Sequence, residues 1–331
     1  MKQIQLECTV FEGENSVYLF GADDPDTPVT LVDAGVAVEE VRDQLQSALA
    51  SEDLSFADIE TVFLTHFHGD HSGLAGFIQE QSDATIYAHH DDADLIERDV
   101  SAWESLFATQ KAKLNEWGMP TDKQDELIPY LEGVETMSDG APTVTRFEAG
   151  DRFEVGDLTF EAVHMPGHTE GQCGFVVDRG EGNELLSGDA LLPKYTPNVG
   201  GADVRVEKPL QKYLDTLTGI VAADYTVAWP GHRQRIDDPA ARAKYIIDHH
   251  RERTEKVLAV LRDHGPADAW TVSAHLFGDL HSIHILHGPG EAYAHLSHLE
   301  ADGVVENTDD GYEIVDSEPA LDELFPAVEL A

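Results

Sequence analysis

Four side chains that can bind a metal ion lie within six residues of one another, directly after an apolar run. The segment 62–76 reads VFLTHFHGDHSGLAG, and its first three residues have the apolar character of a buried strand. The potential ligands that follow are His66, His68, Asp70 and His71. Imidazole and carboxylate groups suit a borderline ion such as zinc, and a loop at a strand end lets the backbone turn so that ligands converge. We interpret this segment as the nucleus of a metal site.

Three more potential ligands each follow a predicted strand, and a glycine precedes each of them. They are His168 in MPGHTEG, Asp189 in LSGDA and His232 in WPGH. Glycine permits a tight backbone turn that can aim the next side chain back toward a common site. Each motif alone is weak evidence, because a lone Gly-His pair is more often an ordinary turn. Together with the first cluster, they favour one site assembled from several strand ends.

This constellation resembles the metallo-β-lactamase-fold hydrolase superfamily. The resemblance covers about residues 1–235, and Asp33-Ala34-Gly35 matches the early Asp-x-Gly that this family carries at the end of a strand. It implies an α/β fold, specifically an αββα metallo-β-lactamase sandwich, with metals at one edge of the paired sheets. The motif set is typical of the superfamily and does not single out one activity.

The resemblance also implies a set of roles for these residues. One metal ion would be held by His66, His68 and His168. The second would be held by Asp70, His71 and His232, with Asp189 bridging the two ions. Zinc is the expected metal, and iron or manganese could replace it. Two zinc ions about 3.5–4 Å apart can share a hydroxide at neutral pH, which attacks a carbonyl or phosphoryl centre.

Two aspartates have further expected roles in this site. Asp70 is expected to be catalytic as well as a ligand, because it can orient the attacking nucleophile. Asp33 is expected to support a ligand without binding metal itself. The alternative for Asp33 is that it caps the N-terminus of the following helix.

The chain is strongly acidic along its whole length. Its 331 residues include 64 Asp and Glu but only 21 Lys and Arg, which gives a net charge of −43 at pH 7. The even spread argues against a disordered acidic tail, and such a charge is typical of halophilic proteins. We therefore expect a haloarchaeal source with a high-salt cytoplasm. The charge also counts against nucleic-acid binding, which needs clustered Lys and Arg.

Composition sets further limits on the class of protein. The length allows one large core and a smaller unit. No run of about 18 apolar residues and no charged-then-apolar N-terminal pattern occurs, so we expect a cytoplasmic protein that does not contact the membrane. The two cysteines, Cys8 and Cys173, lie in apolar surroundings. We expect them to be small buried side chains without a disulfide.

Hydrophobic periodicity predicts a strand-rich catalytic domain over residues 1–238. The predicted strands are 4–10, 15–20, 29–32, 59–64, 85–88, 143–147, 152–155, 158–164, 175–178, 184–186 and 226–229, and the predicted helices are 38–49, 73–81 and 213–217. Residues 91–140 are predicted to be a helical insertion, with one helix over 93–117 and a second over 122–131. This insertion could roof a pocket, or it could be a simple crossover connection.

After residue 238 the pattern is mostly helical and ends in a β-hairpin. Helices are predicted over 240–262, 271–276 and 291–302, and hairpin strands over 303–307 and 311–315. We interpret 239–318 as a small winged-helix-like domain and 319–331 as a tail. This arrangement resembles the lactamase-beta-like subgroup, which includes thioesterase-like and ribonuclease members. The wing is acidic, so we expect it to pack on the catalytic domain or on the partner in a homodimer rather than to bind nucleic acid.

Several histidines lie outside the metal constellation. His281, His284 and His287 recur at intervals of three residues, and we expect them near the pocket rim; an extra metal site and a substrate contact are the alternatives. The pair His89 and His90, followed by Asp91, Asp92 and Asp94, is predicted to lie in a solvated loop. His164 falls inside a predicted strand, and we expect it to be a core residue.

The sequence favours one function and leaves others open. The leading hypothesis is a dinuclear zinc hydrolase that acts on a small ester, lactone or thioester, the last as in glyoxalase II. The alternatives are a metal-dependent ribonuclease or phosphodiesterase, an iron-dependent persulfide dioxygenase, and a winged-helix regulator with a vestigial hydrolase domain. The intact ligand set argues against the last of these. A flavodiiron-type redox role is disfavoured because those proteins carry a glutamate where His68 stands. The expected partner is a small-molecule substrate, whose identity the sequence does not specify.

Overall fold

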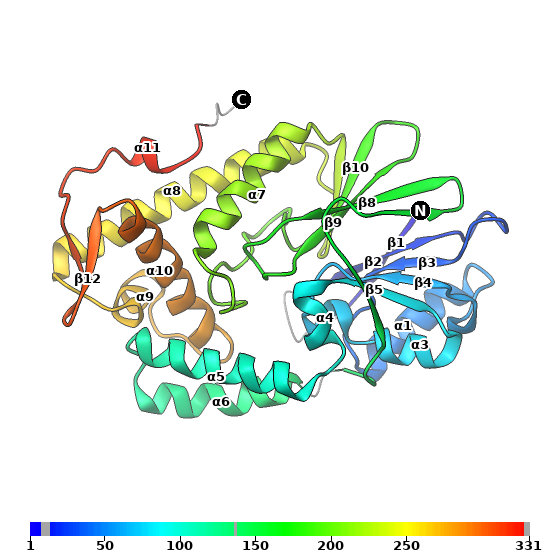
Figure 1. The fold of residues 1–331 in the computed structure, drawn as a ribbon, viewed down its shortest axis with the longest axis horizontal. Helices are drawn as coiled ribbons and strands as arrows, with labels where there is room; N and C mark the ends of the chain where they lie inside the picture. The colour runs from blue at the N-terminus through cyan, green and yellow to red at the C-terminus, as the bar shows by residue number, and fades with distance from the viewer. Residues whose placement is uncertain (8–13, 136–137, 328–331) are drawn as a thin grey trace.

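The computed structural model describes residues 1–7, 14–135 and 138–327 (Figure 1). Cys8, one of the two predicted buried cysteines, lies outside these residues. The other, Cys173, is buried and forms no disulfide with any described residue. Among the described helices, none is long and apolar enough to cross a membrane.

The first sheet has six strands in the order β1-β2-β3-β4-β5-β6. They are β1 (Lys2–Leu6), β2 (Asn15–Phe20), β3 (Thr30–Val32), β4 (Thr61–Phe63), β5 (Thr85–His89) and β6 (Val144–Phe147). β2 is antiparallel to its neighbours β1 and β3, while β3 to β6 run parallel. The carboxyl ends of β3 and β4 therefore lie at one edge of this sheet. Asp33 follows the first of these strands and the histidine cluster follows the second.

The second sheet has five strands in the order β11-β10-β9-β8-β7. They are β7 (Arg152–Val155), β8 (Leu158–His164), β9 (Cys173–Asp178), β10 (Asn183–Gly188) and β11 (Val227–Pro230). The predicted hairpin between β9 and β10 is confirmed. Because β9 is antiparallel to both β8 and β10, and β11 is parallel to β10, the strands β8, β10 and β11 point the same way. Their carboxyl ends carry the other three predicted ligands to one edge.

The two sheets pack face to face through an aromatic core. Phe63 of the first sheet stacks on Phe160 of the second at a ring-centroid distance of 5.5 Å and packs against the tilted ring of Phe175 at 5.1 Å. Helices α1 (Glu39–Ala50) and α3 (Ala75–Ser82) pack on the first sheet, and α7 (Pro209–Ala223) and α8 (Pro239–His264) pack with the second. The remaining short helices of this part are η1 (Phe56–Asp58) and α2 (Gly69–Ser72). The predicted αββα sandwich is confirmed.

The insertion is helical, as predicted, but its first helix is broken. In place of one helix over 93–117 there are two, α4 (His90–Ile96) and α5 (Val100–Glu116), followed by α6 (Thr121–Glu135). The break falls at Arg98, whose φ of +61° is incompatible with a continuing helix. Asp99 then caps α5, since its carboxylate accepts a hydrogen bond from the Ala102 N–H at 2.9 Å.

The C-terminal part contains the predicted helices and hairpin. These are α9 (Ala269–Phe277), α10 (His284–Ala301), the strands β12 (Val305–Thr308) and β13 (Gly311–Ile314), and α11 (Leu321–Leu324) in the tail. The third helix was predicted to begin at residue 291, whereas α10 begins about two turns earlier, at His284, and contains Pro289. The assignment of this part as a winged-helix domain stays a prediction.

The insertion and the C-terminal helices pack against each other. Figure 1 shows α5 and α6 running beneath α9 and α10. The Trp270 N–H donates to the Trp117 carbonyl at 2.8 Å, and the Lys113 Nζ and Tyr293 Oη atoms are 3.1 Å apart. Segments about 150 to 180 residues apart in sequence therefore form one wall of the molecule.

Three predictions about residues outside the metal constellation are wrong. His89 does not lie in a solvated loop: it ends β5, is buried, and its ring stacks on His164 at 4.4 Å. His164 is only half-buried rather than a core residue, and its ring contacts the Glu170 carbonyl at 2.6 Å. Asp92 is fully buried in α4. The sequence predicted solvent exposure for His89 and Asp92 because acidic residues lie next to them along the chain.

Candidate metal centre

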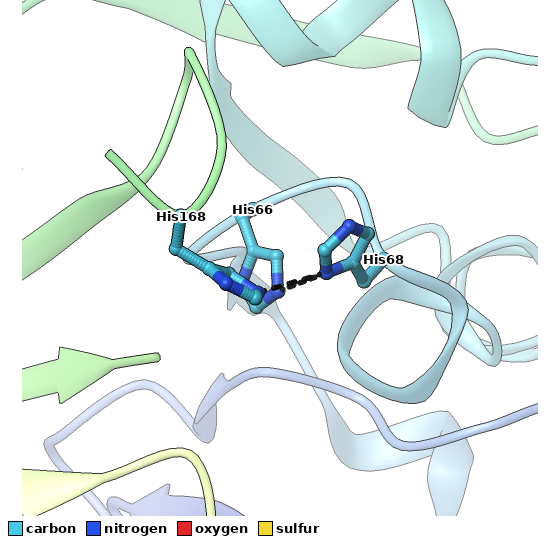
Figure 2. A group of neighbouring side chains, drawn as sticks. All are labelled: His66, His68 and His168. Atoms are coloured by element: carbon cyan, nitrogen blue, oxygen red, sulfur yellow. Dashed lines mark hydrogen bonds between the residues drawn. The ribbon is translucent and has the colours of Figure 1, made fainter. Parts of the chain in front are cut away.

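Three histidine rings from two separate loops converge on one point (Figure 2). His66 and His68 follow β4, and His168 follows β8. The His68 Nδ1 atom is 3.0 Å from His66 Nε2 and 3.1 Å from His168 Nε2. These spacings are those of three nitrogens that can share one tetrahedral ion. We call these three residues the first ligand group.

The opposite nitrogen of each ring contacts an oxygen of the protein. His68 Nε2 faces the Ala202 carbonyl at 3.2 Å, and His168 Nδ1 faces the Asn198 carbonyl at 3.0 Å. His66 Nδ1 lies 3.0 Å from the Thr65 hydroxyl. A carbonyl can only accept, so the His68 and His168 rings carry their protons on these sides and turn their lone pairs inward. This arrangement prepares both rings to bind metal.

The other four predicted ligands lie beside the first group. The Asp70 Oδ2 atom is 3.7 Å from His71 Nε2 and 3.5 Å from His232 Nε2. Asp70, His71 and His232 form the second ligand group, and their ligand atoms lie within 4.8 Å of one another. Asp189 lies between the groups: its carboxylate oxygens are 3.5 Å from His71 Nε2, 3.4 Å from His232 Nε2 and 3.7 Å from His168 Nε2. The structure thus brings all seven predicted side chains together.

Asp33 takes the supporting position predicted for it. Its carboxylate accepts hydrogen bonds from the Thr65 N–H at 2.8 Å and the Thr65 hydroxyl at 3.0 Å, and it contacts His71 Nδ1 at 2.8 Å. The helix-cap alternative is wrong, because α1 begins six residues later and its N-cap residue is Val38. Asp33 therefore links the strand end that carries the first group to a ring of the second group.

The glycines before the ligands do not all act through backbone conformation. Gly188 has a φ of +49°, which fits the expected tight turn before Asp189. Gly231, before His232, has no positive φ. It is required for space instead, because a Cβ there would lie 2.4 Å from Asp189 Oδ1 and 2.5 Å from the His71 ring.

Burial and neighbouring charges shift the pKa values of these groups in different directions. Burial, reinforced by neighbouring rings, lowers the pKa of His66 well below its ordinary value and that of His168 to about 4. Burial opposes the charge on Asp189, but the adjacent His232 and His71 rings hold its pKa well below the usual range. Burial also acts on His71 and His232, but the neighbouring carboxylates outweigh it and raise the pKa of His71 well above its ordinary value and that of His232 to about 9. Neutral imidazoles and ionised carboxylates are the forms that bind metals, so binding at the second group would release protons.

Two buried polar atoms of the site have no hydrogen-bond partner in the described part of the chain. They are His71 Nε2 and Asp189 Oδ1. An unsatisfied buried polar atom costs about 1–3 kcal/mol, so such atoms call for a partner. A divalent ion held by these groups would give both atoms a partner. The donor set of five imidazoles and two carboxylates fits zinc, and it also fits iron or manganese.

The sequence did not reveal several residues that hold the site. Asn15, at the start of β2, donates from Nδ2 to Asp70 Oδ2 at 3.1 Å. Asp92 accepts from the Phe67 N–H at 3.1 Å, the Thr169 hydroxyl at 3.1 Å and the Gly171 N–H at 3.2 Å. It thereby ties the loop of His66 and His68 to the loop of His168. Neither residue stands in a motif, so no local signal could have found it.

Asp92 belongs to a buried ion cluster. Arg205 contacts Asp92 and Asp203 at 2.6 Å each, and both carboxylates are essentially inaccessible to solvent. Asp203 also accepts from the Glu170 N–H at 2.9 Å. Because two carboxylates share one guanidinium, removal of Arg205 would leave both charges buried and unpaired.

A cavity of about 810 Å³ opens onto the ligands. His68, Asp70, His168, Asp189 and His232 line its floor. Most of its wall is apolar and comes from the insertion and the C-terminal helices: Trp103, Leu106, Phe107, Leu131, Phe277, Leu280, Ile283 and Leu286. Of the two possibilities left open for the insertion, a roof over a pocket and a simple crossover, the cavity lining favours the first. Of the three rim histidines, His284 and His287 line the cavity, whereas His281 does not.

Comparison with known proteins agrees with this geometry. The family model described as the metallo-beta-lactamase superfamily matches residues 10–232. A Bacillus subtilis (strain 168) protein named probable metallo-hydrolase YqjP is 29% identical over 300 residues, which cover 88% of this chain and 90% of that protein. The beta-lactamase-like protein 2 homolog of Caenorhabditis elegans is 27% identical over 281 residues, covering 84% of this chain and 76% of that protein.

Solved structures extend the similarity to almost the whole chain. A metallo-beta-lactamase family protein from Thermus thermophilus superposes with a TM-score of 0.80 at 27% identity, covering 95% of this chain and 98% of that one. A beta-lactamase domain protein from Burkholderia ambifaria shares the fold, with a TM-score of 0.77 at 23% identity over 95% of this chain and 92% of that one. The chain belongs to the metallo-beta-lactamase superfamily and is a metal-dependent hydrolase of that superfamily.

Proposed function

We propose that the protein is a dinuclear zinc hydrolase of small esters, thioesters or lactones that carry a bulky apolar acyl group. The observation that carries this proposal is the cavity, which is walled mainly by aromatic and aliphatic side chains and floored by the two ligand groups. An apolar wall stabilises an apolar substrate group by removing it from water. An acyl group lodged there would present its carbonyl to the floor.

The ligand groups would supply the hydrolytic chemistry once loaded. Two zinc ions held by these groups would lower the pKa of water enough to provide a nucleophile at neutral pH and would draw charge from the attacked carbonyl. The side chains of the protein fix this arrangement. Asp189 lies between the two groups, and the Asn15 amide holds Asp70 at the cavity floor. From there Asp70 can accept a hydrogen bond from the attacking water and orient it.

Charge and shape argue against a nucleic-acid substrate. The net charge of −43 repels a polyanion at ordinary ionic strength. The cavity walls offer apolar side chains where a phosphodiester backbone would need Lys and Arg. The ribonuclease or phosphodiesterase alternative is thus disfavoured, and it becomes one arm of the test.

A series of acyl thioesters with one thiol and increasing acyl length tests this proposal. We expect kcat/KM to rise about fourfold for each CH₂ that enters the cavity, from about 0.8 kcal/mol of transfer free energy, until the cavity is filled. Phe107→Ala should remove this gain for long chains and spare the shortest substrate. Val100→Ala, on the same helix at a position 71% exposed, is the matched control.

Other outcomes would replace the proposal. Cleavage of single-stranded RNA or a phosphodiester, without any preference among acyl groups, would favour the nuclease alternative. One iron per chain with oxygen uptake on a persulfide substrate would favour the dioxygenase. Metal analysis of the purified protein is the first experiment, because it distinguishes the iron-dependent dioxygenase from the proposed hydrolase, which requires about two zinc ions per chain.

The remaining expectations concern the location, the C-terminal domain and the oligomeric state of the enzyme. A cytoplasmic location at high salt, a winged-helix character for residues 239–318 and a homodimer all remain proposals. The acidic composition supports the first of them. Thermal unfolding in 0.1 M and 2 M KCl is a direct test: a halophilic protein gains stability as salt screens its carboxylates, and a lower Tm in 2 M KCl would count against it.

A further inference from the structure

The loop 198–202 carries both carbonyls that orient the first ligand group. The Asn198 carbonyl faces His168, and the Ala202 carbonyl faces His68. The outer nitrogen of the His71 ring is held differently, by the side chain of Asp33. Any movement of this loop would therefore displace acceptors of the first group alone.

This loop rests directly on helix α10. The Asn198 amide donates from Nδ2 to the His287 carbonyl at 3.1 Å and to Glu291 Oε2 at 3.3 Å. The same side chain accepts the Gly201 N–H at 3.1 Å. Asn198 thus connects three parts: its own carbonyl reaches a ligand ring, its amide reaches the helix, and its side-chain oxygen closes the loop.

Two glycines let the loop and helix backbones meet. A Cβ at Gly290 would lie 2.3 Å from Gly201 Cα and 2.5 Å from Gly201 N. A Cβ at Gly200 would lie 2.5 Å from the Gly290 carbonyl oxygen. Real Cβ contacts are essentially never this short, and the atoms met belong to the backbone. A side chain at residue 290 would therefore push the loop away from the helix.

Glu291 is fixed from α8. Its Oε1 atom lies 3.0 Å from the Arg253 guanidinium, which stacks at 4.7 Å on the Phe277 ring. Glu291 also lies with His250 and His295 in a buried group whose ligand atoms are within 4.8 Å of one another. The guanidinium already compensates the carboxylate, and the Thr254 hydroxyl contacts His295 at 2.7 Å. The Glu291 carboxylate is thus held in place from α8 by the Arg253 guanidinium.

We propose that Gly290 and Glu291 are positioning residues: through the loop 198–202 they orient His68 and His168, so that the C-terminal helices set the metal affinity of the first ligand group. The contact between the loop 198–202 and α10 does not support the second group, because Asp33 and Asn15 hold that group instead. The inference rests on the proposed two-metal function. It assigns the C-terminal part a defined task at the metal centre, in addition to its share of the cavity wall.

Zinc titration of the apo protein against a competing chelator tests this assignment. Wild type is expected to bind two ions. In Gly290→Ala and in Glu291→Ala, we expect the affinity for one ion to fall by about 10- to 100-fold, the range typical of lost supporting contacts, while the other ion is unaffected. The controls are Gly219→Ala, where a Cβ on α7 meets nothing within 4 Å, and Glu300→Ala, an exposed residue of α10.

Cobalt substitution identifies the ion that is lost. In cobalt-loaded protein the ring N–H protons of His68 and His168 give shifted proton resonances, and their contacts with Ala202 and Asn198 should slow their exchange with water. We expect both signals to exchange faster in the two variants and to be unchanged in the controls. A purely structural role would lower the Tm of the apo protein and leave these signals alone.

The results separate this inference from the proposed function. Equal weakening of both ions, or unchanged affinities and N–H exchange in both variants, would overturn the inference. A wild type that binds a single ion would overturn the two-metal function; the inference would then stand or fall on whether Gly290→Ala weakens an ion bound to His68 and His168.

Discussion

The two ligand groups are supported by different parts of the fold and by different chemistry. Main-chain carbonyls of a loop orient His68 and His168, and that loop lies on α10. The second group is held by side chains of the first sheet, Asp33 behind His71 and Asn15 beside Asp70. The first support is assembled from elements up to about 220 residues apart in sequence. The second draws on the first 71 residues, together with His232.

This difference indicates which part of the site is the more sensitive to distant change. A carboxylate that contacts a ring directly tolerates small shifts of the surrounding helices. A backbone carbonyl can reach its ring only if the whole loop is correctly placed. The first group should therefore respond to substitutions in the C-terminal helices, and the second should respond mainly to substitutions in β2 and β3.

Removal of a ligand of the first group should have the largest effect. His68→Ala deletes one of three converging nitrogens, and we expect hydrolysis to fall by about 10³-fold or more, with loss of one bound metal ion. Steady-state kinetics and metal analysis measure both. His281→Ala, 76% exposed and absent from the cavity wall, is the matched control. Unchanged turnover in His68→Ala would exclude a metal mechanism.

The next largest effect is expected at the buried ion cluster beneath the first group. Arg205→Met leaves the carboxylates of Asp92 and Asp203 buried without a cation, which typically costs about 3–5 kcal/mol of unfolding free energy. Denaturant unfolding of the apo protein measures it. Arg152→Met, which removes a mostly exposed pair with Glu161, should cost below about 1 kcal/mol. Similar losses in both variants would show that the cluster is not a special support.

Asp33→Asn should weaken the second group more than it affects His68 and His168 of the first group. Asp33 has a φ of +62°, which asparagine tolerates, so the backbone can stay in place while the charge behind His71 is lost. We expect the affinity for one metal ion to fall by about 10- to 100-fold, with the slow N–H exchange of His68 and His168 retained. The exposed Asp26→Asn is the control. Faster N–H exchange of His68 or His168 in this variant would contradict the proposal that separate contacts support the two groups.

Acid should also destabilise the support of the first group. Burial, reinforced by His249 and Arg253, lowers the pKa of His250 to about 3, and burial also lowers that of His295. Between the ordinary histidine pKa of 6.5 and these lowered values, the unfolded chain binds more protons than the folded chain. Stability is therefore complete above pH 6.5 and is lost as the pH falls, by up to about 1.4 kcal/mol per pH unit for each histidine.

His250→Gln checks the acid effect. The variant removes one titrating group and keeps a polar side chain, so its Tm should depend less steeply on pH between 4 and 6.5 than that of wild type. The measurement uses the metal-free protein, because acid also releases metal ions. A slope equal to that of wild type would assign the acid sensitivity to other groups.

Much of the fold could be predicted because its signals are local. The alternation of apolar residues located β7, β8 and the β9–β10 hairpin to within two residues at each end, and turn residues marked the ends of the insertion. The prediction missed the break at Arg98 and the early start of α10. Both helix boundaries depend on tertiary packing. The spacing of apolar residues along the chain does not show where such packing ends or starts a helix.

The sequence by itself determined the candidate ligand set and pointed to metal-dependent hydrolysis. Metal binding requires particular side chains after particular strands, and those requirements are written into short motifs around His66, His168, Asp189 and His232. Only the tertiary structure decided how these ligands are held. Asp92, Asn198 and Glu291 act through contacts across about 80 to 95 residues, which depend on the assembled fold and leave no pattern along the chain.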